Sequence, residues 1–165
     1  MESRIKLLGH PVHPMLIVFP LGLLATAVIF DVLYLATANA DLATFSFWAM
    51  AAGLVGGLLA AIFGLIDWLA IPKGTRAKRI GAFHGGGNLI VVLLFAVSFL
   101  MRTSRAAYLP DIQPFIVALL GAALALVTAW LGGELVFRLR VAVDDDAGLD
   151  ASNSLAREGA VEVRT

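Results

Sequence analysis

The sequence predicts an all-α integral membrane protein: a bundle of four transmembrane helices with both termini in the cytoplasm. Its 165 residues are 60% hydrophobic and only 15% charged, and the mean hydropathy is +0.91. An ordinary soluble domain is far less apolar. Four apolar segments follow one another, and each is long enough to cross a bilayer core of about 30 Å. The formal net charge is zero, so no basic surface indicates a nucleic-acid partner.

The four predicted helices span about residues 15–36, 45–71, 80–101 and 115–137. Pro20 lies inside the first helix and is expected to bend it, because proline offers no N–H to the carbonyl of Leu16. The helices form one transmembrane domain, residues 1–143. The chain then turns acidic and polar, which predicts a disordered acidic cytoplasmic tail over residues 144–165.

The orientation follows from the cations near the helix ends, because Lys and Arg accumulate on the cytoplasmic side. Eight cations fall at one end of the predicted bundle and two at the other. The eight are Arg4, Lys6, Lys73, Arg76, Lys78, Arg79, Arg138 and Arg140, and the two are Arg102 and Arg105. Both termini are therefore predicted to be cytoplasmic, and the expected location is the bacterial inner (plasma) membrane.

Side chains that can bind a metal or a cofactor converge on the predicted cytoplasmic end. The segment Gly9–Pro14 places His10 and His13 at the start of the first helix, and His84 and Asn88 lie one turn apart where the third helix begins. Asp67 closes the second helix and Glu134 the fourth. In the second helix, small residues form one stripe that leads to Asp67, which predicts a helix–helix seam. The stripe consists of Gly53, Gly57, Ala60 and Gly64.

Three uses of this cluster stay open. His13 or His10 can hold a b-type haem together with His84, with Asn88 close by. A divalent metal (zinc, iron or copper) can take His10, His13 and His84 with Asp67 or Glu134 as ligands. In the third use no cofactor binds, and these side chains only join helices. The chain has no cysteine, which excludes thiolate metal sites and cysteine-ligated iron–sulfur clusters.

Asp31 lies apart from the cluster, toward the outer side of the membrane. A carboxylate at that depth needs a partner, and Arg102 at the end of the third helix is expected at the same level. We predict a structural ion pair between Asp31 and Arg102.

The chain also has a faint internal symmetry. His13 and Asp67 open and close the first pair of helices, as His84 and Glu134 open and close the second pair. The intervals of 71 and 67 residues differ by about one helical turn. Two hairpins related by an axis along the membrane normal would produce this pattern.

These motifs resemble the bacterial membrane-protein family named domain of unknown function 2231 (DUF2231). The likeness covers roughly residues 5–143 and rests on Gly9–Pro14 with Phe19-Pro20, Asp31, Gly64–Asp67, His84 with Asn88, and Gly132–Val136. Some members of the family are joined to Rieske-type iron–sulfur domains, so the resemblance implies a redox association. The chain departs from the family after Gly132–Glu134, where Phe137 stands in place of the tyrosine that is frequent there.

No nucleophile motif, phosphate loop or dinucleotide fingerprint is present, so a stand-alone enzyme has little support. The expected function is a haem-binding or metal-binding, redox-associated membrane subunit. The alternatives are a structural membrane partner, whose histidines and carboxylates only join helices, and a small metal or ion transporter. The expected partners are the lipid bilayer and either a redox protein or a second copy of the chain.

Overall fold

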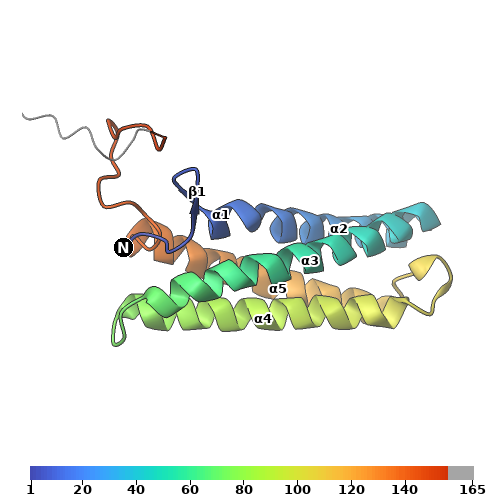
Figure 1. The fold of residues 1–165 in the computed structure, drawn as a ribbon. Coiled ribbons are helices and arrows are strands. Elements are labelled where there is room, and N and C mark those ends of the chain that lie inside the picture. The colour runs from blue at the N-terminus through green and yellow to red at the C-terminus, as the bar shows by residue number, and fades with distance from the viewer. Residues whose placement is uncertain (156–165) are drawn as a thin grey trace, which may run out of the picture.

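The computed structural model describes residues 1–155, and four long apolar helices dominate it (Figure 1). Each is long and apolar enough to span a membrane, which confirms the predicted four-helix membrane protein. The helices are α1 (Val12–Leu16), α2 (Val18–Thr37), α3 (Ala40–Ala70), α4 (Arg76–Arg102) and α5 (Ile112–Gly133), with a 3₁₀ turn η1 (Ala106–Tyr108) and a π-helical turn η2 (Glu134–Arg138). Two short strands, β1 (Lys6–Leu7) and β2 (His10–Pro11), precede them.

Helices α3 and α4 begin four to five residues earlier than the apolar segments alone predicted. Each begins at a residue whose side chain caps the helix. The Asn39 side chain accepts a hydrogen bond from the N–H of Asp41, and the Thr75 hydroxyl accepts one from the N–H of Lys78. Such caps satisfy backbone groups that have no partner inside the helix. The start of each helix is therefore set by its capping residue and not by the first apolar residue.

The first transmembrane segment is interrupted where α1 gives way to α2, at Ile17. The N–H of Ile17 still bonds the carbonyl of His13, and the N–H of Leu21 bonds the carbonyl of Ile17. Between them, Pro20 has no N–H for the carbonyl of Leu16. The short helix α1, which contains His13, is thus a separate turn at the entrance to the span.

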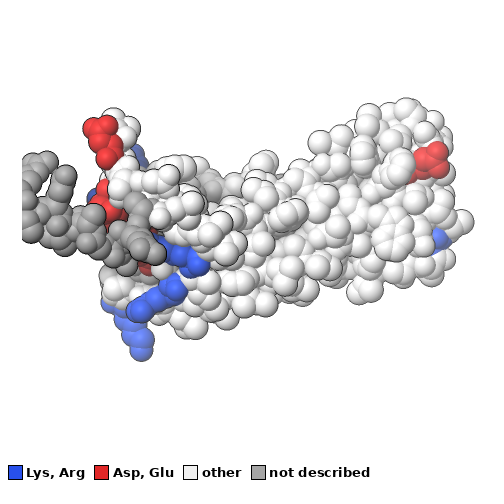
Figure 2. Space-filling model, turned by 45° about the horizontal axis from the view of Figure 1, so that its top comes forward, with Lys and Arg blue, Asp and Glu red and all other residues white. Residues whose placement is uncertain are grey.

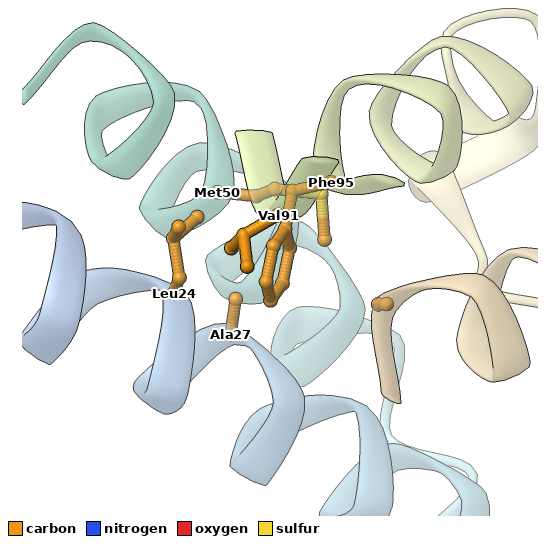
Figure 3. Packing of buried hydrophobic residues seen from close by; sticks show 6 residues of the cluster. Leu24, Ala27, Met50, Val91 and Phe95 are labelled. Atoms are coloured by element: carbon orange, nitrogen blue, oxygen red, sulfur yellow. The ribbon is translucent and has the colours of Figure 1, made fainter. Parts of the chain in front are cut away.

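The four long helices run side by side as two hairpins, α2 with α3 and α4 with α5 (Figure 1). Further contacts join α3 to α4 and α2 to α5, which closes the bundle. Its centre is a small apolar core, in which side chains from neighbouring helices meet (Figure 3). The buried members are Leu24, Ala27, Met50, Val91, Phe95 and Ala118.

The N-terminal segment folds back across the end of the bundle as a two-stranded hairpin. Leu7 pairs with His10, so the turn is Leu8-Gly9, and both residues have positive φ (52° and 80°). This conformation matches a type I′ hairpin turn. The segment also contacts the chain after the last helix: the N–H of Ala142 bonds the carbonyl of Met1 at 2.9 Å.

The chain from Asp144 to residue 155 forms turns beside this hairpin and no helix or strand. Lys6 Nζ contacts Glu2 at 2.8 Å and Asp144 at 2.5 Å. The hydrogen bonds to Asp144 and Glu2 raise the pKa of Lys6, and the bond from Lys6 lowers the pKa of Glu2. The rest of the predicted tail, residues 156–165, lies outside the described residues.

Candidate functional site

His13 and His84 come together between the two hairpins. Their ring centroids are 6.4 Å apart, and the ring planes are perpendicular. His13 lies in α1 and His84 in the third turn of α4, so residues distant in the sequence meet at one level of the bundle. We call these two residues the histidine pair.

Each ring of the histidine pair is fixed by a backbone carbonyl of the next helix. His13 Nδ1 lies 2.8 Å from the carbonyl oxygen of Ala60 in α3, and His84 Nδ1 lies 2.8 Å from that of Thr128 in α5. Because a carbonyl only accepts, Nδ1 of each ring must hold the proton. A neutral imidazole protonated on Nδ1 presents an unprotonated Nε2, which is the form that binds a metal.

A glycine lies one turn beyond each of these carbonyls and makes room for the ring. A methyl group at Gly64 would come within 2.8 Å of Cε1 of His13, and one at Gly132 within 3.1 Å of Cε1 of His84. Such clearances are shorter than ordinary van der Waals contacts. Each imidazole therefore lies in a carbonyl–glycine notch, and any larger residue would displace it.

Asn88 completes the surroundings of His84. Its amide nitrogen donates to the carbonyl of His84 at 2.9 Å and lies 3.3 Å from Nε2 of that ring. The Thr128 hydroxyl donates to the Asn88 carbonyl oxygen at 3.0 Å. The expected proximity of Asn88 and His84 is thus present, and Thr128 links Asn88 to α5.

The two notches are equivalent parts of an internal repeat. Gly53 packs against Leu24 as Gly121 packs against Phe95. At a second pair of equivalent positions the Ser46 hydroxyl donates to the carbonyl of Ala27, and the Ser98 hydroxyl donates to that of Pro114, so the donor is on the second helix in one half and on the first helix in the other. Equivalent residues of the first helices are 71 apart, and those of the second helices are 68 apart. The pairs are His13/His84, Leu24/Phe95, Ala27/Ser98 and Asp31/Arg102, and Ser46/Pro114, Gly53/Gly121, Ala60/Thr128 and Gly64/Gly132.

The repeat corrects one detail of the symmetry seen in the sequence. An interval of 67 residues makes Asp67 equivalent to Glu134, whereas the contacts of Ala60 and Thr128 set the interval at 68. The residue equivalent to Asp67 is therefore Leu135. The first helices keep the predicted interval of 71, and both hairpins start at the same end of the bundle, as expected for parallel repeats about an axis along it (Figure 1).

Asp31 and Arg102 meet at the other end of the same axis. Arg102 Nη1 donates to Asp31 Oδ1 at 2.8 Å, and Nη2 donates to Oδ2 at 2.6 Å. Both side chains are completely buried. The hydroxyls of Ser46 and Ser98 accept from the same guanidinium at 3.2 and 3.1 Å. The ion pair is thus bidentate and lies far from the histidine pair.

The other expected site residues lie apart from the histidine pair. His10 is exposed in β2, and its Nε2 lies 3.3 Å from the hydroxyl of Ser154. Asp67 is buried and accepts from the Ser3 hydroxyl at 2.8 Å and the Arg4 N–H at 2.8 Å. Glu134 pairs with Arg76 at 2.5 Å. The cluster expected from the sequence therefore separates into a pair of imidazoles and three independent contacts.

Several groups that define the site have no direct signal in the sequence. The acceptors of His13 and His84 are backbone carbonyls, which any residue type provides. Gly64 was assigned to a helix–helix seam, and its contact with a histidine ring was not foreseen. The signal that could have revealed equivalent notches is the interval of 68 residues between Gly64 and Gly132, which the predictions from the sequence did not use.

Within residues 1–155, no three His, Asp or Glu side chains converge closely enough to hold a metal ion. The histidine pair thus offers two protein ligands. Two ligands satisfy a metal only when other groups fill its remaining positions.

One comparison with known proteins gives a match. The model of the family described as predicted membrane protein (DUF2231) matches residues 9–145. No curated protein and no solved structure matches the chain. The matched region contains all four long helices, the histidine pair and the ion pair of Asp31 with Arg102. The chain therefore belongs to the DUF2231 family of predicted membrane proteins.

Proposed function

We propose that this membrane protein binds one b-type haem between His13 and His84 and serves as a redox-associated membrane subunit. The supporting observation is the separation of 6.4 Å between the two imidazole centroids. Two imidazoles that bind one metal from opposite sides, with nitrogens about 2.0–2.1 Å from it, have centroids roughly 6 Å apart. When bound, the haem supplies reversible transfer of one electron at its iron.

The number of ligands favours haem over a bare metal ion. A zinc, iron or copper ion held by protein alone needs about four ligands. A haem iron already has four nitrogens from the macrocycle and needs only two axial ligands. The described residues provide two imidazoles and no third ligand beside them, which suits haem.

The hydrogen bonds of the pair suit axial ligation. The Nδ1–H bonds to the carbonyls of Ala60 and Thr128 fix both rings and make each Nε2 a better donor to a metal. Ligation at His84 would replace the 3.3 Å contact of Asn88 with Nε2, and Asn88 would keep its 2.9 Å bond to the His84 carbonyl. Asn88 thus holds the start of α4 in either state.

The surface of α4 beside His84 has space for a bound group. Gly85 and Gly86 follow it directly, and a methyl group at either would meet no atom within 4 Å. Glycine is costly inside a helix, by about 1 kcal/mol relative to alanine, so the two residues suit close approach of a flat group.

The experiment is an absorption spectrum of gently purified protein, oxidised and reduced, after expression with sufficient haem. We expect a Soret band, about one haem per chain, and loss of the band in His13→Ala and in His84→Ala. His10→Ala and Asp31→Asn are the matched controls and should keep the band. Protein that binds no haem, or a band that survives in His84→Ala, would contradict the proposal.

The second candidate is a structural membrane partner, and the same hydrogen bonds favour it. His13 joins α1 to α3, and His84 joins α4 to α5. In that case, alanine at either position lowers the melting temperature of a colourless protein and changes no spectrum. A small ion transporter has less support, because the level between the histidine pair and Asp31 is filled by the apolar core (Figure 3).

A further inference from the structure

Exposed cations gather at the end of the bundle where the chain enters the first helix and where α3 connects to α4. Figure 2 shows Lys and Arg side chains grouped there, next to a long uncharged surface. Among them, Arg79 in α4 and Arg138 in η2 are exposed, and neither side chain has an acidic partner within the part of the chain that the structure describes.

A salt bridge places these two arginines on either side of one seam. Arg76 Nη2 lies 2.5 Å from Glu134 Oε1 and fastens α4 to η2. Arg79 follows Arg76 by about one turn, and Arg138 follows Glu134 by about one turn. Because α4 and η2 run in opposite directions, Arg79 lies deeper than the bridge and Arg138 lies farther out, and a long side chain extends from each. The charges of Arg76 and Glu134 neutralise each other in this bridge. The uncompensated positive charges beside it are those of Arg79 and Arg138.

Large exposed aromatic side chains lie beside these arginines or deeper on the same helices. Phe83 follows Arg79 in α4 and is 69% exposed, and Trp130 precedes Glu134 in α5 and is 66% exposed. Phe137, beside Arg138, is 84% exposed. Aromatic rings take this position at the level of the lipid headgroups, just below the charged groups. We call Arg79, Arg138, Phe83, Trp130 and Phe137 the headgroup surface.

At the same end of the bundle, the lysine of the N-terminal hairpin has acidic partners. Lys6 of the N-terminal hairpin contacts both Glu2 and Asp144, so its charge is neutralised within the chain. Arg4, Lys73 and Arg140 are exposed too and have no acidic side-chain partner among residues 1–155. Of these unpaired cations, Arg79 and Arg138 are the two on the elements that the Arg76–Glu134 bridge joins.

We propose that the headgroup surface binds an anionic phospholipid, whose phosphate is held by Arg79 and Arg138 and whose acyl chains lie along Phe83, Trp130 and Phe137. Guanidinium groups bind phosphate oxygens through paired N–H donors, which suits Arg at both positions. A long uncharged surface adjoins the charged end of the bundle (Figure 2), which favours a lipid over a free anion.

The test is native mass spectrometry of the purified protein with phosphatidylglycerol or phosphatidylcholine of identical acyl chains. Each cation near an anionic lipid surface favours it by roughly five-fold, so two arginines predict a preference of roughly 30-fold for phosphatidylglycerol. The double variant Arg79→Gln/Arg138→Gln should lose this preference. Both side chains are exposed, so the fold should persist, and the melting temperature checks it.

Arg105→Gln is the matched control, because it removes one arginine at the opposite end of the bundle, where Arg105 pairs with Asp111. It should keep the preference. Equal binding of the two lipids by the wild-type protein would overturn the proposal and leave the arginines to an acidic protein partner. A preference that survives in the double variant would also overturn it. Displacement of the bound lipid by inorganic phosphate alone would show recognition of a free anion and overturn it as well.

Discussion

Asp31 and Arg102 are bound to each other by two hydrogen bonds inside the bundle, at the end opposite the histidine pair, and they occupy equivalent positions of the internal repeat, 71 residues apart. Neither side chain is accessible. Removal of one partner leaves the other buried without compensation, which typically costs about 3–5 kcal/mol. The pair is therefore the most sensitive electrostatic contact among residues 1–155.

A double-mutant cycle tests this contact. Asp31→Asn and Arg102→Gln should each lower the free energy of unfolding, and the double variant should lose less than the sum. The expected coupling is about 0.5–3 kcal/mol, measured by reversible unfolding in mixed micelles. Additive losses would show that the two residues do not stabilise each other in the membrane.

The predicted orientation can be checked with single cysteines, because the chain has none of its own. Asn39 caps α3 at one end of the bundle, and Ser154 lies beside His10 at the other. With both termini in the cytoplasm, an impermeant thiol reagent added to intact cells should label Asn39→Cys and not Ser154→Cys. Labelling of Ser154→Cys in intact cells would reverse the orientation.

Alanine at the notch glycines should disturb the histidine pair. In Gly64→Ala the new methyl group lies within 2.8 Å of the His13 ring, which must move away from the Ala60 carbonyl. If the proposed haem binds, the haem content of this variant should fall markedly, as measured by the Soret absorbance per chain. Gly22→Ala is the control, since its methyl group meets nothing within 4 Å. Equal haem content in the two variants would disprove the role of the notch.

If the proposed haem binds, the perpendicular ring planes of His13 and His84 would determine the electronic spectrum of its ferric iron. Perpendicular axial imidazoles leave two iron d orbitals nearly equal in energy, whereas parallel ones separate them. We expect an electron paramagnetic resonance spectrum with a single strongly shifted low-field feature. Three well-resolved rhombic features would mean that the rings turn on ligation.

The contact of Ser3 with Asp67 should hold the N-terminal segment in place. Both side chains are buried, and the hydroxyl lies 2.8 Å from each carboxylate oxygen. Ser3→Ala removes one donor from a buried carboxylate, a loss of about 1–3 kcal/mol. Proteolysis within residues 1–11 should then become faster, with Ser154→Ala as an exposed control. Unchanged cleavage would show that other contacts hold the segment.

The features that the sequence could predict are those set by composition and by the cost of buried charge. Helix number follows from the length of apolar segments, and the proximity of Asp31 and Arg102 follows from the need of each charge for a partner. The meeting of His13 and His84 at one end follows from their places at helix starts.

Other features depend on groups that leave little trace in the sequence. The hairpin turn at Leu8-Gly9 lacks the Asn-Gly or Asp-Gly pattern typical of such turns, and Leu8 takes a positive φ that leucine rarely adopts. Asp67 binds a serine hydroxyl and a backbone N–H of a segment more than sixty residues away. Glu134 pairs with Arg76 of another helix, although Arg138 lies one turn away in its own.

The opposite charges at one repeated position also determine which halves can associate. Two copies of the first hairpin about the same axis would bring Asp31 against another Asp31, and two copies of the second would oppose two Arg102 side chains. Like charges without compensation are very unfavourable in a lipid-embedded core. If two molecules exchange hairpins, a first hairpin can therefore pair only with a second hairpin. The two halves of the repeat are complementary, and neither can replace the other.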